Sequence, residues 1–361
     1  MGKSFLFLPD ISGFTKFVQS TEVEHSQHVI AELLEVLIAA NTLDLKLAEV
    51  EGDALFFYKE GEIPSQEKLL AQIETMFTAF YGHLKLLETN RICPCNACAS
   101  APKLQLKIVA HCGDFQFIEV QGNRKPFGQK VIEAHRLLKN SIDSDNYALI
   151  SRELANEIEL PIYYWSKLYR FKEGKDIYDG KEVAYIFSLI DQSKLMLTTF
   201  SKGSEIRFDQ PPEFVFEKEF SMSATTLMEY ITNYTYRHHW VKGVDKFEYN
   251  ENEVTRLGSE HICVINGKHL NFVTVTKDVQ SGSLIYGEMT MSPPPVDALY
   301  QFYIIKPLSK SSCLLRVETF WKAKSPIKKL ALALFIKRLL KKNTERSIHN
   351  LAKFATMQTT P

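Results

Sequence analysis

The sequence predicts an α+β protein of two domains, the first with a ferredoxin-like antiparallel sheet and helices. Three observations support this. The chain has 361 residues, more than one core of roughly 100 to 200 residues accounts for. Its first half follows the order strand, helix, hairpin, helix, strand, which is the ferredoxin-like order. This pattern breaks near Pro211 and Pro212, a pair typical of a linker or a domain-opening turn.

The elements of the first domain follow from the spacing of apolar residues. Continuous apolar runs indicate buried strands, and apolar residues three and four apart indicate amphipathic helices. Ser65 is placed to open the second long helix. We expect a strand over residues 4–9, a helix over 24–41, a hairpin over 43–61, a helix over 65–88, a hairpin over 104–123, a short helix over 128–141 and a last strand pair ending near residue 190.

The domain boundaries follow from the same pass along the chain. We expect a first domain over residues 1–190, a linker over 191–212 and a second domain over 213–361. The second domain begins with a strand and a helix. A series of strands follows to about residue 320, and a long helix is expected from residue 326 to about 354.

Composition excludes several classes of function. Lys and Arg together number 43, as do Asp and Glu, so no overall field favours nucleic acid. The first ten residues lack the apolar core of a signal peptide, and no apolar run approaches the roughly 18 residues of a membrane span. Six cysteines, three of them in one short motif, fit a reducing compartment. We therefore expect a cytoplasmic protein.

Two carboxylates are expected to meet at one edge of the first sheet. In the ferredoxin-like order the first strand lies beside the third; Asp10 ends the first and Asp53 starts the third. Carboxylates about 5 Å apart at an effective dielectric of about 20 repel by roughly 3 kcal/mol. A divalent cation, Mg²⁺ or Mn²⁺, relieves this repulsion and can hold phosphates. The alternative is that Asp10 caps the next helix and Asp53 occupies a turn.

Five segments carry a resemblance to a known family. They are PDISGFTKF (9–17), EVEGDALFF (49–57), AHCGDF (110–115), FGQKVIEAHRLL (127–138) and, more loosely, YRFKEGKDIYDGKEVAYIF (169–187). Their order and spacing resemble the class III nucleotidyl (adenylate/guanylate) cyclase catalytic domain over residues 4–190. The resemblance implies a homodimer with active sites at the subunit interface, where the ribose 3′-oxygen attacks the α-phosphate and pyrophosphate leaves.

The resemblance also implies roles for individual residues. Asp10 and Asp53 match the metal ligands, and the nucleoside triphosphate would meet the segment after the first strand. Lys172 matches the triphosphate-binding lysine loosely. The residues of that segment that match nucleotide-contacting positions are Ile11, Gly13, Phe14 and Thr15.

Two further residues match the positions that read the base. Glu49 is an acceptor that suits the N1 and N2 donors of guanine, and Lys125 is a donor that suits guanine O6. Together they favour GTP over ATP. The alternative is that the two side chains form a surface ion pair worth well under about 1 kcal/mol.

One position departs from the family pattern. The transition-state Asn and Arg of the family lie four residues apart on a helix; this chain has Arg136 but carries Ile132 where the Asn belongs. Losing one such transition-state contact commonly costs about 10² to 10³ in rate. The departure puts catalysis in doubt while leaving the fold unaffected.

Three cysteines form a candidate zinc site. Cys93, Cys95 and Cys98 lie in a CxCxxC arrangement in a loop between a helix and a strand. A structural zinc site needs four ligands, so a fourth must come from elsewhere. The candidates are Cys112, His83, His111 or a residue of a dimer mate. The alternatives are free thiols in a loop or a redox pair.

The second domain resembles the START or polyketide-cyclase-type (SRPBCC) helix-grip fold. The markers are the segment over 214–244, with Trp240, and the closing helix over 326–355. The resemblance implies a cavity for a hydrophobic small molecule or lipid. Aromatic residues expected on the strands could line it or could equally be core: Phe214, Phe216, Phe272, Tyr286, Tyr300 and Phe302. The closing helix carries a basic run, which is either a solvated face or a membrane-surface contact. Its members are Lys322, Lys324, Lys328, Lys329, Lys337, Arg338, Lys341 and Lys342.

Three functions compete. The first is a signalling cyclase that prefers GTP and is regulated by a hydrophobic ligand in the second domain. The second is a degenerate cyclase domain that binds nucleotide as a sensor. The third is a lipid-binding or small-molecule-binding protein whose first domain serves only for dimerisation.

Overall fold

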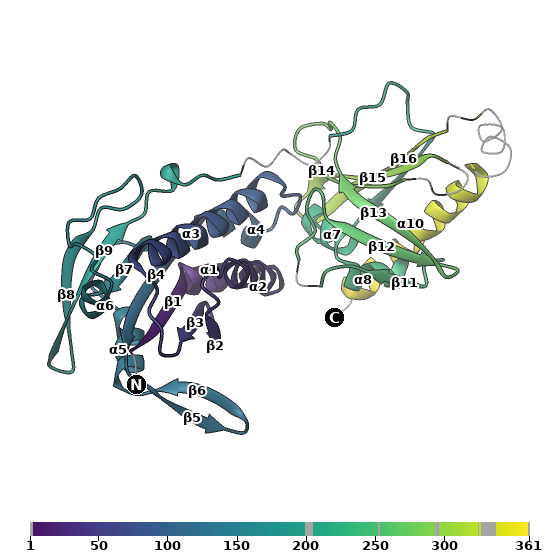
Figure 1. The fold of residues 1–361 in the computed structure, drawn as a ribbon. Coiled ribbons are helices and arrows are strands. Elements are labelled where there is room, and N and C mark those ends of the chain that lie inside the picture. The colour runs from purple at the N-terminus through teal and green to yellow at the C-terminus, as the bar shows by residue number, and fades with distance from the viewer. Residues whose placement is uncertain are drawn as a thin grey trace. The chain divides into compact units, whose positions relative to one another are not determined.

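The computed structural model describes residues 3–198, 205–251, 253–291, 293, 296–323, 325 and 337–359. The chain forms two compact units (Figure 1). The first comprises Met1–Leu86 and Ser100–Thr199, and the second comprises Leu87–Ala99 and Phe200–Pro361. The thirteen-residue segment with the cysteine motif thus belongs to the second unit, although its sequence interrupts the first.

The first unit is built on a seven-stranded mixed sheet in the order β2-β3-β1-β4-β7-β9-β8. The predicted pairing of the first strand with the third is confirmed: β1 runs antiparallel to β3. One neighbouring pair, β4 and β7, is parallel. The strands are β1 (Ser4–Ser12), β2 (Lys46–Glu51), β3 (Ala54–Lys59), β4 (Gln105–Gly113), β7 (Tyr147–Ser151), β8 (Lys172–Tyr178) and β9 (Lys181–Leu189).

Both faces of the central strand β1 are buried. Leu6 and Leu8 belong to a core cluster with residues of α5, whereas Phe5 and Phe7, on the opposite face, are also fully buried. Ser65 opens α3 as predicted, its hydroxyl accepting from the Lys68 amide. The helices of the first unit are α1 (Phe14–Ser20), α2 (Val23–Ala39), α5 (Gln129–Leu137) and α6 (Arg152–Glu157), with 3₁₀ turns η1 (Ala101–Lys103) and η2 (Gln192–Lys194). The long helix α3 (Gln66–Thr89) begins in the first unit and ends in the segment assigned to the second, which also holds all but the last residue of α4 (Asn96–Ser100).

The hairpin predicted over residues 104–123 is wrong in its pairing. β4 pairs with β1 and β7 inside the main sheet. The next strands, β5 (Gln116–Val120) and β6 (Asn123–Phe127), pair with each other in a separate two-stranded sheet. Alternation of apolar residues marks a strand but does not choose its partner, which explains the error.

The second unit contains a seven-stranded antiparallel sheet in the order β10-β16-β15-β14-β13-β12-β11. The single helix expected near residue 230 is divided, because Asn233 leaves the helical conformation and caps α8 by accepting from the Thr235 amide. The elements are β10 (Phe214–Phe220), α7 (Ala224–Thr232), α8 (Tyr234–Trp240), β11 (Lys246–Glu248), β12 (Glu260–Ile265), β13 (Lys268–Val275), β14 (Leu284–Met291), β15 (Ala298–Ser309), β16 (Ser312–Lys322) and α10 (Lys337–Thr359).

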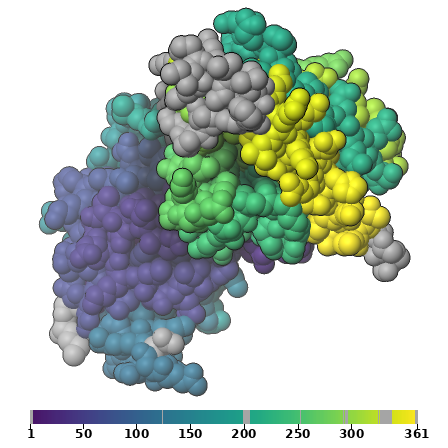
Figure 2. All heavy atoms as spheres, turned by 90° about the vertical axis from the view of Figure 1, so that its right-hand side faces the viewer, coloured from purple at the N-terminus to yellow at the C-terminus, as the bar shows by residue number. Residues whose placement is uncertain are grey.

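Each face of this sheet has its own core. Residues of α7, α8 and α10 pack on one face, and Figure 2, in which α10 is yellow, shows that helix at the surface of the second unit. On the other face, Phe208 stacks on Phe320 with ring centroids 3.9 Å apart. Phe208 lies inside the expected linker, so the end of that segment packs on the second sheet. Residues 326–336, where the closing helix was expected to begin, lie outside the described residues.

No described helix combines the length and apolar character that crossing a bilayer requires.

Candidate functional site

The two predicted carboxylates come together where β1 meets the turn before β3. Asp10 is the seventh residue of β1 and lies opposite Ala54, so the strand continues through it rather than ending there. Asp53 lies in the turn just before β3, and its carbonyl accepts a hydrogen bond of 3.0 Å from the Ile11 amide. Sheet register therefore holds both residues at one edge, as their sequence positions predicted.

Burial raises the pKa of both carboxylates above that of an ordinary aspartate. Burial is the largest cause that raises the pKa of Asp10; the Asp53 and Asp145 charges add to it, Lys107 opposes it, and the net pKa is about 6. Burial also raises the pKa of Asp53. Desolvation and like charge both disfavour the ionised form of a carboxylate. A group of this kind binds cations readily, because a cation offsets both effects.

Lys107 is a member of this site that the sequence did not reveal. It lies on β4 directly opposite Asp10 in the ladder, and its Nζ is 3.6 Å from Asp10 Oδ1. Its ammonium group occupies the position of a counter-ion to the carboxylates. A lysine in an alternating strand gives no sign of its partner until the pairing register is known. The donor set, two or three carboxylate oxygens, suits Mg²⁺ or Mn²⁺, which would compete with this lysine.

The residues matched to nucleotide contacts lie at the end of β1 and at the start of α1. Ile11 is fully buried in the strand. Gly13 has φ 87°, a left-handed conformation that glycine adopts without strain. It precedes α1, which begins at Phe14 and Thr15. The glycine lets the chain turn sharply from the buried strand into the helix beside Asp10.

The two predicted base-reading residues contact each other. Lys125 Nζ on β6 donates to Glu49 Oε1 on β2 at 2.6 Å, and both side chains are about two-fifths exposed. The structure thus brings the pair together, but as the surface ion pair that was the alternative interpretation.

Arg136, Ile132 and Lys172 lie on other elements than the two carboxylates. Arg136 on α5 forms an ion pair with Asp179. Ile132, one helical turn earlier, is half exposed rather than buried in a core. Lys172 begins β8, the edge strand four positions from β1 in the sheet order, so the two strands are roughly 19 Å apart. Within one subunit, Lys172 therefore does not meet Asp10.

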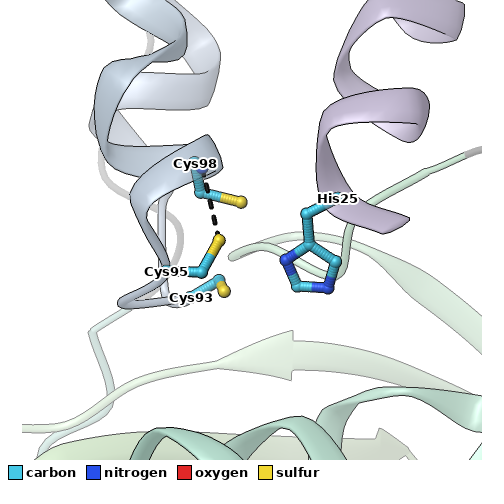
Figure 3. Close-up of side chains that lie close together, drawn as sticks. All are labelled: His25, Cys93, Cys95 and Cys98. Carbon is cyan, nitrogen blue, oxygen red and sulfur yellow. Dashed lines mark hydrogen bonds between the residues drawn. The ribbon is translucent and has the colours of Figure 1, made fainter. Parts of the chain in front are cut away.

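The three cysteines of the motif form a compact group at the start of α4. Cys93 and Cys98 are buried and Cys95 is partly exposed. The Cys98 amide donates to Cys95 Sγ at 3.3 Å, as the dashed line in Figure 3 shows. The neighbouring Cys93 and Cys95 thiols, with burial, raise the pKa of Cys98. Figure 3 also draws the imidazole of His25.

The candidates named for a fourth zinc ligand have other surroundings. His83 Nε2 lies 2.8 Å from Glu32 Oε2, and His111 Nδ1 lies 2.8 Å from the Ser151 hydroxyl. Cys112 is fully buried in β4, and burial raises its pKa to about 12. All three are held inside the first unit.

A second group of acidic and histidine side chains is explained by ion pairs. His111, Glu133 and Glu153 have ligand atoms within 4.8 Å of one another. Lys130 forms ion pairs with both carboxylates, and Lys181 Nζ lies 3.2 Å from Glu133. Burial lowers the pKa of His111 to about 4, so the ring is neutral. Lysine already supplies the counter-charge in this cluster.

Part of the chain matches a family of unknown function and one curated relative. Residues 30–147 match a family described as proteins of unknown function, DUF2652. Over 126 residues the chain is 32% identical to the uncharacterized protein Rv2561/Rv2562 of Mycobacterium tuberculosis. This match spans 35% of the chain and 58% of the length of that relative.

Similar solved structures include proteins of two kinds. One is the guanylate cyclase domain of RhGC from Catenaria anguillulae in complex with GTP, with 15% identity, TM-score 0.37, and coverage of 53% of this chain and 98% of that one. Another is a norcoclaurine synthase from Thalictrum, with 14% identity, TM-score 0.31, and coverage of 41% and 95%.

Proposed function

We propose that the first unit binds a nucleoside triphosphate through a divalent cation held by Asp10 and Asp53, as a cyclase-like signalling domain that acts in a homodimer. The observation that carries the proposal is the convergence of Asp10 on β1 with Asp53 in the turn before the adjacent strand β3, with the pKa of both raised. The motif resemblance supports the nucleotide as the ligand. Mg²⁺ or Mn²⁺ would supply the positive charge that the triphosphate needs.

The chain's own residues have distinct roles in this proposal. Asp10 and Asp53 hold the cation once they are ionised, which for Asp10 requires a pH above about 6. The Lys107 ammonium neutralises Asp10 until the cation arrives. Lys172, distant from Asp10 in its own subunit, would act on a triphosphate only across a dimer interface, in agreement with the dimer that the motifs imply.

A preference for GTP follows if the base displaces the ion pair between Glu49 and Lys125. That pair is solvent-exposed, and exposed pairs contribute roughly 0 to 1 kcal/mol. Opening it therefore costs little. Glu49 would then accept from the guanine N1 and N2 donors, and Lys125 would donate to O6.

A second candidate function is nucleotide sensing without turnover. The observation that favours it is Ile132, which presents an apolar side chain, 50% exposed, at the helix position where the family has an amide. An isoleucine cannot hydrogen-bond a ribose. In this case the carboxylates bind the metal and nucleotide, but the rate of cyclisation stays near background.

The test is incubation of the full chain with Mn²⁺ and each of the four nucleoside triphosphates. Binding is measured by calorimetry and cyclic product by mass spectrometry. Asp10→Asn and Asp53→Asn should abolish binding, whereas Asp44→Asn, at an exposed loop position, should not. Binding with product supports the cyclase, and binding without product supports the sensor. Unchanged binding in both Asp10 and Asp53 variants would remove the metal site and the proposal with it.

A further inference from the structure

The second unit contains a partly open cavity of about 170 Å³ with a buried ion pair in its wall. Arg237 on α8 and Glu288 on β14 both line this cavity, and Arg237 Nη2 donates to Glu288 Oε2 at 2.6 Å. Their side chains are 3% and 6% exposed. Binding sites are mostly apolar with a few placed polar groups that orient the ligand, and this ion pair is such a polar group.

A hydrogen-bond network extends from this pair. Arg237 Nη1 donates to the Tyr286 hydroxyl at 2.8 Å, and the same hydroxyl lies 3.2 Å from Glu288 Oε2. The Tyr234 hydroxyl connects Tyr286, at 3.1 Å, with His261 Nδ1, at 2.7 Å. Burial and the Arg237 charge lower the pKa of His261 to about 2, so its ring is neutral. The network therefore holds one positive and one negative charge.

Several donors and acceptors of this network remain unused. In the part of the chain that the structure describes, Arg237 Nε, His261 Nε2 and Thr274 Oγ1 are buried without a hydrogen-bond partner. Thr274 lies directly opposite Glu288 across the ladder, and such neighbours project to the same face of a sheet. Leaving buried polar atoms unpaired costs free energy. Of these residues Arg237 lines the cavity, and an unpaired buried donor on a lining residue indicates a polar ligand.

Size and charge narrow the class of ligand. A cavity of about 150 Å³ accommodates one benzene molecule, so this cavity suits a molecule of about one ring rather than a lipid. Trp240, Phe272 and Tyr303 supply aromatic lining. By contrast Tyr300 and Phe302, expected from sequence as candidates for a cavity lining, belong to the core on the other face of the sheet.

Charge favours an acid as the ligand. Lys242, which is exposed, also lines the cavity, so the charged lining residues are two cations and one anion. A carboxylate entering past Lys242 would find an unused donor in Arg237 Nε. Charge-assisted hydrogen bonds of this kind are about twice as strong as neutral ones.

We propose that this cavity is a binding site for a small ring-containing carboxylic acid, with the ring against the aromatic lining and the carboxylate on Arg237. The proposal concerns the second unit alone. It stands or falls independently of nucleotide binding, because its readout is binding of an organic acid in the absence of nucleotide and metal.

The test compares two probes of similar shape, phenylacetate and propylbenzene, titrated into the full chain and followed by NMR chemical-shift changes. We expect phenylacetate to bind about 10-fold or more tightly than propylbenzene, since only the acid uses the Arg237 donor. Equal affinities, tighter binding of propylbenzene, or no saturable shift with either probe would overturn the proposal.

Two double variants test whether phenylacetate binding depends on the ion pair of Arg237 with Glu288. Arg237→Met combined with Glu288→Met removes both charges together and so avoids leaving one buried charge alone. This variant should lose about 10-fold or more in phenylacetate affinity and keep its affinity for propylbenzene. Glu205→Met with Arg207→Met removes an exposed ion pair of the same unit and should leave both affinities unchanged. Circular dichroism checks that the Arg237/Glu288 double variant is folded. Undiminished phenylacetate binding in the folded double variant would contradict the assignment. If the double variant is unstable, a single Lys242→Met variant decides the case, because it is expected to weaken the binding of phenylacetate only.

Discussion

Lys107 faces Asp10 across the pairing of β4 with β1, and its Nζ lies 3.6 Å from Asp10 Oδ1. The sheet register thereby places a fixed ammonium group at the carboxylates that a divalent cation would use. The two cations compete for the same negative charge. Removing one should strengthen the binding of the other.

The first prediction concerns Lys107→Met. Without the ammonium group, Asp10 and Asp53 should bind Mn²⁺ at least about 3-fold more tightly at pH 8, which is above the pKa of Asp10. The reason is that attraction between close charges reaches about 1 kcal/mol or more even under partial screening. Isothermal titration calorimetry measures this. Lys46→Met, at an exposed position of β2, is the control. Weaker Mn²⁺ binding in the Lys107 variant would show that the lysine helps to bind the cation.

The second prediction concerns stability and pH. The pKa of Asp10 is about 6 in the folded chain and 3.8 in the reference state. Between these values the folded chain binds more protons than the unfolded chain, so the Asp10 contribution to the free energy of unfolding falls as pH rises through this window. Asp10→Asn removes the penalty. We expect it to stabilise the chain by about 1 to 3 kcal/mol at pH 7.5 and by almost nothing at pH 3.5.

Urea denaturation of the wild type and the Asp10→Asn variant at the two pH values measures this difference. Asp44→Asn, an exposed position, should show no difference at either pH. A destabilised Asp10→Asn chain at pH 7.5 would mean that the Lys107 ion pair outweighs the burial of the carboxylate.

The third prediction separates the two candidate functions. Ile132→Asn places an amide one helical turn before Arg136, at a half-exposed position where it fits without repacking. If the first unit is a cyclase weakened at this position, turnover with Mn²⁺ and GTP should rise by about 10². Ile132→Leu is the matched control. Nucleotide binding with no product in any variant would favour the sensor.

The fourth prediction is stoichiometric zinc at Cys93, Cys95 and Cys98. Elemental analysis of the full chain, purified under reducing conditions without chelator, should give about one zinc per chain. Changing any of the three to Ser should lower this content, whereas Cys313→Ala, another buried thiol of the second unit, should not. Metal-free wild-type protein would contradict the zinc site.

The sequence predicted those features that depend on local pattern and on strand order. Asp10 and Asp53 were placed together because alternation and helix spacing implied the pairing of β1 with β3. Contacts set by register between distant segments were missed. Lys107 and the pair of Arg237 with Glu288, 51 residues apart, have no local signal, since each residue alone is typical of a solvated surface.

The position of the cysteine segment has a consequence for the order in which the chain is made. The Asn90 side-chain amide donates to the carbonyl of Leu257, 167 residues later, and the Asn90 carbonyl accepts from the Leu257 amide. At a synthesis rate of roughly 5 to 20 residues per second, the ribosome completes Leu257 roughly 8 to 30 seconds after Asn90. During that interval the segment with Cys93, Cys95 and Cys98 has been synthesised, but the rest of the second unit, to which it belongs, has not. The thiols are therefore exposed to oxidants and metal ions until the second unit folds.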